Sequence, residues 1–186
     1  PEAWTDPAVG VDVIVRGDGE DTTRELVRTG SPANVAGLTW RDGGRVIHNP
    51  DRSLTTISDT LYPNRAKRRY RYRISYRNIG LGYSFDSLLS SQGCPFNCKF
   101  CSFKTNTLGQ KRDWSARTPE SVMKELAEID AKVIAFIDDN FFADIKRVNR
   151  ICDLILEAKM KKIFLANARI TIANHPDLLK KMHRAG

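Results

Sequence analysis

Apolar residues in the second half of the chain switch repeatedly between a strand-like and a helix-like spacing. Short apolar runs at 85–90, 133–137 and 163–166 alternate with amphipathic stretches at 119–130 and 145–159. The pattern therefore predicts strands that alternate with helices. Units of this size imply a parallel sheet with right-handed crossovers, so we expect an α/β fold.

Helix boundaries in this half follow from capping residues. Thr118 suits an N-cap and Pro119 the first helical position, while Pro176 begins a last helix that Gly186 could end. Three strands cannot close a barrel, so we expect the sheet to be an incomplete piece of one. The sequence opens at Pro1 without Met, and we interpret it as part of a longer protein.

The first 50 residues have a different pattern. The β-branched run 11–15 ends in a Gly-rich loop, and 22–27 has the spacing of a short helix. Residues 35–40 and 45–48 flank Asp42-Gly43-Gly44, a turn that suits a hairpin. From 51 to 83 the periodicity disappears, which favours an irregular linker or a strap over another domain.

Composition and hydropathy indicate a globular protein and not a membrane protein. The chain has 186 residues, 41% of them hydrophobic and 28% charged, which is typical of a globular protein. No apolar run is long enough to cross a bilayer, and no signal peptide pattern opens the sequence, so we expect a cytoplasmic location.

The net charge of +8, from 30 Lys plus Arg against 22 Asp plus Glu, is concentrated in the linker. Basic residues there alternate with tyrosines, a composition that could contact phosphates and stack on bases, cover the barrel, or simply form a solvated face. This basic stripe consists of Arg65, Lys67, Arg68, Arg69, Arg71, Arg73 and Arg77.

Three of the four cysteines lie within eight residues, which is unlike a disulfide framework. Cys94, Cys98 and Cys101 follow the first strand of the second half, at the edge where α/β sheets place their chemistry. Three thiolates can hold three corners of an iron–sulfur cubane and leave one iron open. A zinc site or a redox-active Cys98-x-x-Cys101 pair are the alternatives. Cys152 lies on the apolar face of a helix, and we interpret it as a core residue.

The spacing Cys94-x-x-x-Cys98-x-Phe100-Cys101 resembles the signature of the radical S-adenosylmethionine (SAM) superfamily. That resemblance implies a 4Fe-4S cluster, a (β/α) barrel, and SAM bound to the open iron. It also implies that one electron breaks a carbon–sulfur bond of SAM and gives a 5′-deoxyadenosyl radical. Phe100 would lie near the adenine.

Two carboxylates stand at the end of the second strand, in Asp138-Asp139-Asn140-Phe141. In the superfamily this position accepts a hydrogen bond from the SAM ammonium group, so the resemblance implies that Asp138 and Asp139 bind the cofactor. The sequence departs from the usual glycine-rich motif with a glutamate and resembles the version in cobalamin-linked members. Helix capping is the alternative explanation. Arg169, after the third strand, could reach a cofactor carboxylate or be solvated.

The strand and Gly-rich loop at 11–20 resemble the closing part of a Rossmann-like cobalamin-binding domain placed before a radical domain. On this resemblance we assign residues 1–60 to that domain, 61–83 to a basic linker and 84–186 to the first part of the barrel. The family's cobalt-coordinating histidine motif is absent from the sequence. A further role open to the basic stripe is contact with the anionic tail of a cobalamin nucleotide.

These features predict a radical SAM enzyme that uses cobalamin to methylate or remodel an unactivated carbon. The expected partners are a small-molecule, lipid or tetrapyrrole-like substrate and an electron donor such as a flavodoxin or ferredoxin. The alternatives are a radical methylthiotransferase that modifies RNA, and a non-catalytic zinc or nucleic-acid binding module. The residues do not identify the substrate or a catalytic side chain, and we expect this length of chain to bind a cluster with little turnover.

Overall fold

The structure is a computed structural model that describes residues 9–57, 59, 62–77, 79–101, 105 and 109–186. The chain divides into two compact units. The first unit consists of Pro1–Thr55 together with Thr105–Arg112, and the second of Thr56–Lys104 together with Asp113–Gly186. Each unit is described by itself.

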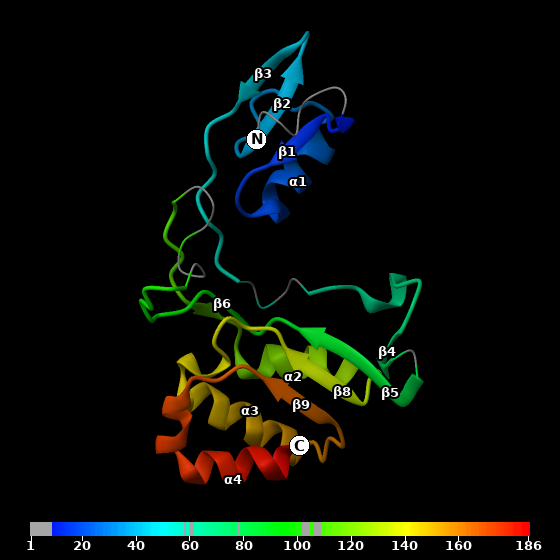
Figure 1. Cartoon of the computed structure of the whole chain (residues 1–186), viewed down its shortest axis with the longest axis vertical. Coiled ribbons are helices and arrows are strands. Elements are labelled where there is room, and N and C mark those ends of the chain that lie inside the picture. The colour runs from blue at the N-terminus through cyan, green and yellow to red at the C-terminus, as the bar shows by residue number, and fades with distance from the viewer. Residues whose placement is uncertain (1–8, 58, 60–61, 78, 102–104, 106–108) are drawn as a thin grey trace. The chain divides into compact units, whose positions relative to one another are not determined.

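The first unit is a small antiparallel sheet with one helix (Figure 1). Strand β2 (Leu38–Asp42) lies between β1 (Val13–Val15) and β3 (Arg45–His48), and helix α1 (Gly19–Thr29) follows β1. The β2–β3 turn uses Gly43 and Gly44, both at positive φ, a conformation that glycine adopts without steric cost. The predicted strand, helix and hairpin are confirmed.

The second unit contains a four-stranded sheet in the order β4-β5-β8-β9. Strands β5 (Ile79–Leu88), β8 (Val133–Phe136) and β9 (Ile163–Ala166) are parallel, as the alternating pattern predicts. Because the three strands are parallel, their carboxyl ends lie at one edge of the sheet. The residues that follow these strands therefore come together there.

Strand β4 (Tyr72–Tyr76) pairs antiparallel with the first half of β5, where the sequence predicts an irregular linker. That prediction is wrong for 72–76 and 79–83, which lie in the two strands of a β-hairpin. The cause is the side chains: Arg and Tyr alternate with the period of a strand, but almost all of the described hairpin positions are exposed, so no apolar alternation marks them. A register shift between Arg73 and Ser75 interrupts the pattern further.

Three helices cover one face of this sheet: α2 (Pro119–Glu128), α3 (Ile145–Glu157) and α4 (Pro176–Ala185) (Figure 1). The Thr118 side chain caps α2 by accepting from the Ser121 amide, as predicted. The shorter elements of this unit are η3 (Arg65–Lys67), β6 (Ser91–Gln92), β7 (Ser115–Ala116), η4 (Phe141–Ala143) and η5 (Ile170–Asn174).

The apolar core lies between these helices and the sheet. Fully buried side chains from α2, β8 and α3 form its centre, and Cys152 of α3 is 5% exposed, which confirms its assignment to the core. The central residues are Val122, Leu126, Ile134, Val148 and Ile151. Among the described helices, none has the length and apolar character that a membrane crossing requires.

Candidate functional site

The three clustered cysteines follow β5 and β6 in one loop at the carboxyl edge of the parallel sheet. Cys94 and Cys98 are partly exposed and Cys101 is exposed, and all three are free thiols. The Cys101 amide donates to the Cys98 carbonyl at 3.1 Å, which closes a tight turn. In the part of the chain that the structure describes, no three His, Cys, Asp or Glu side chains are gathered as at a metal site. The ligand set therefore stays a prediction.

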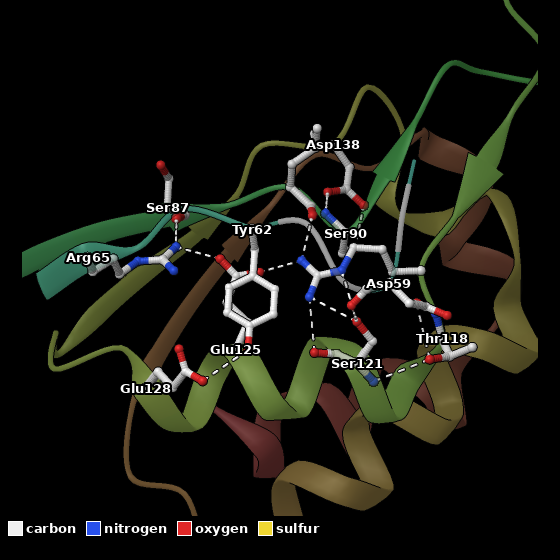
Figure 2. Close-up of polar contacts among 12 residues, drawn as sticks. Asp59, Tyr62, Arg65, Ser87, Ser90, Thr118, Ser121, Glu125, Glu128 and Asp138 are labelled. Carbon is white, nitrogen blue, oxygen red and sulfur yellow. Dashed lines mark hydrogen bonds and ion pairs between the residues drawn. The ribbon is translucent and has the colours of Figure 1, made fainter. Parts of the chain in front are cut away.

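Asp138 holds the start of this loop. Its carboxylate accepts from the Ser90 amide at 2.7 Å and from the Ser90 and Ser91 hydroxyls at 2.6 Å each. Figure 2 shows Asp138 beside Ser90, and Asp138 is only 1% exposed. Hydrogen bonds to a buried carboxylate are among the stronger ones in proteins. This side chain fixes the end of β5 against the end of β8.

The next two residues extend the contact along the loop. Asp139 accepts from the Gly93 amide at 2.9 Å, and the Asn140 side-chain nitrogen lies 4.0 Å from Cys94 Sγ. Asn140 is 4% exposed, and its buried Oδ1 has no partner among the described residues. Residues 138 to 140 thus contact the cysteine loop one after another. Asp139, unlike Asp138, is partly exposed.

Arg169 reaches the same loop from the segment that follows β9. Its Nη1 lies 3.2 Å from Cys98 Sγ, and its guanidinium stacks over the Phe96 ring, 4.0 Å from the centroid. The structure therefore brings Arg169 to the sulfur of a predicted ligand. Phe100, in contrast, is 94% exposed.

A buried arginine supports the start of the loop, and no sequence motif identifies it. Arg147 of α3 donates to the carbonyls of Ser90 and Arg117, each at 2.8 Å. Burial lowers the pKa of the Arg147 guanidinium, which is 8% exposed, and the charge of Asp138 opposes that shift. The only sequence signal is a charged residue on the apolar face of an amphipathic helix.

Part of the basic stripe is internal. Both Arg68 Nη atoms donate to the Asp86 carboxylate, at 2.8 and 3.0 Å, and Arg65 Nε donates to it at 3.2 Å. Arg65 also pairs at 2.6 Å with Glu125, which is 1% exposed and also pairs with Arg117 (Figure 2). Burial acts to raise the pKa of Asp86, but the hydrogen bonds from Arg68 and the Ser87 amide outweigh it and lower that pKa.

The donor chemistry of the loop fits a thiolate-ligated cluster. Three accessible thiols lie on one short loop, whose backbone is held by the two carboxylates and two of whose sulfurs have an amide or guanidinium nitrogen nearby. Such polar groups around ligating sulfurs are the usual surroundings of a metal site. The unpartnered Asn140 oxygen is a further polar atom at the same place.

Residues 88–186, more than half of the chain, match the family description of the radical SAM superfamily. The chain belongs to this superfamily. The match begins at the last residue of β5 and includes the cysteine loop, both acidic residues and Arg169.

Two relatives of this radical SAM chain are methyltransferases. An uncharacterized methyltransferase of Pyrococcus horikoshii is 30% identical over 188 residues, which cover 95% of this chain and 38% of that protein. The cobalamin-dependent radical SAM methyltransferase TokK of Streptomyces tokunonensis is 26% identical over 137 residues, covering 70% of this chain and 20% of that protein. The radical SAM chain described here thus spans less than half the length of either relative.

The fold of this radical SAM chain is also found in a solved structure. OxsB, a cobalamin-dependent SAM radical enzyme with aqua-cobalamin bound, superposes with a TM-score of 0.52 at 20% identity. The superposition covers 82% of this chain and 22% of OxsB. The likeness identifies an α/β fold that resembles a cobalamin-dependent radical SAM enzyme.

Proposed function

We propose that Cys94, Cys98 and Cys101 bind a 4Fe-4S cluster and that the protein uses it to cleave SAM in a cobalamin-dependent methylation or remodelling of an organic substrate. The observation that carries this proposal is the cysteine loop at the carboxyl edge of the parallel sheet, held there by the residues after β8. The superfamily's cluster supplies the electron that breaks a carbon–sulfur bond of SAM.

The chain's own residues have separate parts in this proposal. Asp138 fixes the loop, since its oxygens already accept from Ser90 and Ser91. Asp139 is partly exposed beside the loop and is the better placed of the two carboxylates to accept from the SAM ammonium group. Phe100, an exposed aromatic ring next to Cys101, is available to contact the adenine.

The sheet belongs in this proposal to a larger (β/α) barrel. Side chains alternate between the faces of a strand, and on β9 Phe164 packs on the helix core while Ile163 and Leu165 are 40% and 51% exposed. Exposed aliphatic side chains on the face opposite the helices are what the interior of a barrel would bury. The assignment of residues 1–60 to a cobalamin-binding domain rests on the sequence pattern and on the cobalamin-dependent relative.

The substrate in this proposal is an organic small molecule, and a flavodoxin or ferredoxin would deliver the electron. The RNA-modifying alternative loses support, because Arg65 and Arg68 of the basic stripe are counterions of Asp86 and Glu125 within the protein.

Anaerobic reconstitution tests the proposal. We expect the wild type to bind about four irons with matching sulfide, and its paramagnetic resonance signal, after reduction, to change when SAM is added. Cys98→Ala should lose the cluster. Cys152→Ala, which removes a thiol from the core instead of the loop, should keep it. Zinc in place of iron, or a cluster whose signal ignores SAM, would refute the radical mechanism.

A further inference from the structure

The contact between Arg169 and Cys98 joins a cation to the sulfur of one predicted ligand. Arg169 Nη1 lies 3.2 Å from Cys98 Sγ, within hydrogen-bonding range for a sulfur acceptor. No other sulfur of the cysteine loop has a charged donor in the described structure, since the neighbour of Cys94 is the neutral Asn140 amide at 4.0 Å.

Arg169 is held in place by more than this one contact. Its guanidinium stacks over the ring of Phe96, two residues before Cys98, with 4.0 Å between the guanidinium carbon and the ring centroid. The Nε atom is buried without a hydrogen-bond partner in the described part of the chain. A solvated strand-end arginine would show none of these features, so the side chain is directed at the loop.

We propose that Arg169 is a positioning residue that holds the Cys98 sulfur and raises the reduction potential of the cluster. This inference rests on the proposed function, since it concerns the cluster that the three cysteines would bind. Donors to ligating sulfurs and nearby charge are established determinants of cluster potential. One-electron reduction adds a negative charge to the cluster, and a guanidinium beside a ligand sulfur stabilises that charge. Its removal should therefore make the cluster harder to reduce.

The test compares two variants that each lose one positive charge near the loop. Arg169→Gln removes the guanidinium beside Cys98 Sγ, whereas Lys99→Gln removes an exposed charge from the residue next to Cys98. Both are reconstituted with iron and sulfide in the full-length protein, and the midpoint potential is measured by a dithionite titration followed by paramagnetic resonance. An Arg169→Met variant takes the place of Arg169→Gln if the latter does not fold.

We expect Arg169→Gln to shift the midpoint to a more negative potential and Lys99→Gln to leave it near the wild-type value, because exposed charges are screened by solvent. Loss of the cluster from a folded Arg169→Gln protein, with retention in Lys99→Gln, would equally support the holding role. An unchanged midpoint, or equal shifts in both variants, would overturn the inference. A wild type that binds no iron would instead refute the proposed function, so the two failures are distinguishable.

Discussion

Asp138 shows how much of the site depends on one side chain. A carboxylate that is almost fully removed from water is costly unless its oxygens accept hydrogen bonds, and here three donors from Ser90 and Ser91 satisfy it. The same three bonds fix the backbone that leads to Cys94. The residue therefore links the stability of the unit to the position of the predicted ligands.

We expect Asp138→Ala to destabilise the apo protein by about 3 kcal/mol, since it leaves the Ser90 and Ser91 donors without their charged acceptor in a buried place. Urea denaturation followed by circular dichroism measures this. Asp177→Ala is the control, because Asp177 is exposed and pairs with the likewise exposed Lys180 at 3.6 Å, a kind of surface contact that contributes little to stability. Equal midpoints for the two variants would show that the buried hydrogen bonds do not stabilise the protein.

At the scale of single residues, the sequence predicts where the site residues lie in the fold better than it predicts which groups they contact. The cysteine spacing and the acidic strand end both mark the right edge of the sheet, but the resemblance assigns Asp138 to the cofactor, whereas its oxygens are occupied by Ser90 and Ser91. Its role toward the cofactor stays a prediction, as does that of Asp139. Arg147 could not have been found, because one charged residue within a helix carries no motif.

At the level of elements, side chains of helix α2 hold the segment that precedes the β4–β5 hairpin. Glu125 lies on the buried side of α2 between Arg65, which precedes the hairpin, and Arg117, which precedes the helix (Figure 2). Tyr62 donates to Glu128 one turn further along α2, at 2.9 Å. The basic segment is thus fastened to the helix by a carboxylate that the core encloses.

Glu125→Gln should destabilise the protein by about 3 kcal/mol, because it removes the charged partner of the buried Arg117 and leaves Arg65 with Asp86 alone. The measurement is again the urea midpoint of the apo protein. Glu157→Gln is the matched control: Glu157 is also on a helix and pairs with an arginine, Arg150, but its side chain is 63% exposed. If the control lost as much stability as Glu125→Gln, burial of the pair would not be the cause.

The elements that the sequence predicted correctly are those with one apolar face. Helices α2 and α3 and strands β8 and β9 bury such faces, so their periodicity is visible, and the structure places each within three residues of the predicted ends. The β4–β5 hairpin has no such face, and its Arg and Tyr residues gave only a charge pattern. Pairing between β4 and β5 is made by backbone hydrogen bonds, which composition does not encode.

Across the whole molecule, the net positive charge is larger than the number of basic side chains that are available on the surface would suggest. The excess of +8 is concentrated in the basic stripe, yet two of its seven members, Arg65 and Arg68, neutralise buried carboxylates, and Arg71 pairs with Asp130 at 2.7 Å. A nucleic-acid surface needs cations that are available to phosphates. The charge of the chain is therefore in part a means of burying Asp86 and Glu125.

The reactivity of the four thiols tests two parts of the molecule, because three thiols lie in the cysteine loop and the fourth lies in the core. Burial raises the pKa of Cys152 to about 11, so at pH 8 it is almost entirely protonated as well as inaccessible. Only thiolates react quickly with alkylating reagents. We expect anaerobic alkylation of the native apo protein at pH 8 to modify three cysteines quickly, and denaturant to expose the fourth.

Mass spectrometry counts the modified residues, and Cys152→Ala should give three under both conditions. Reconstitution with iron and sulfide should then protect Cys94, Cys98 and Cys101 together, since a cluster engages all three sulfurs at once. Protection of only Cys98 and Cys101 would favour a redox-active pair or a different metal site. Rapid modification of Cys152 in the native state would contradict its burial in the core of the second unit.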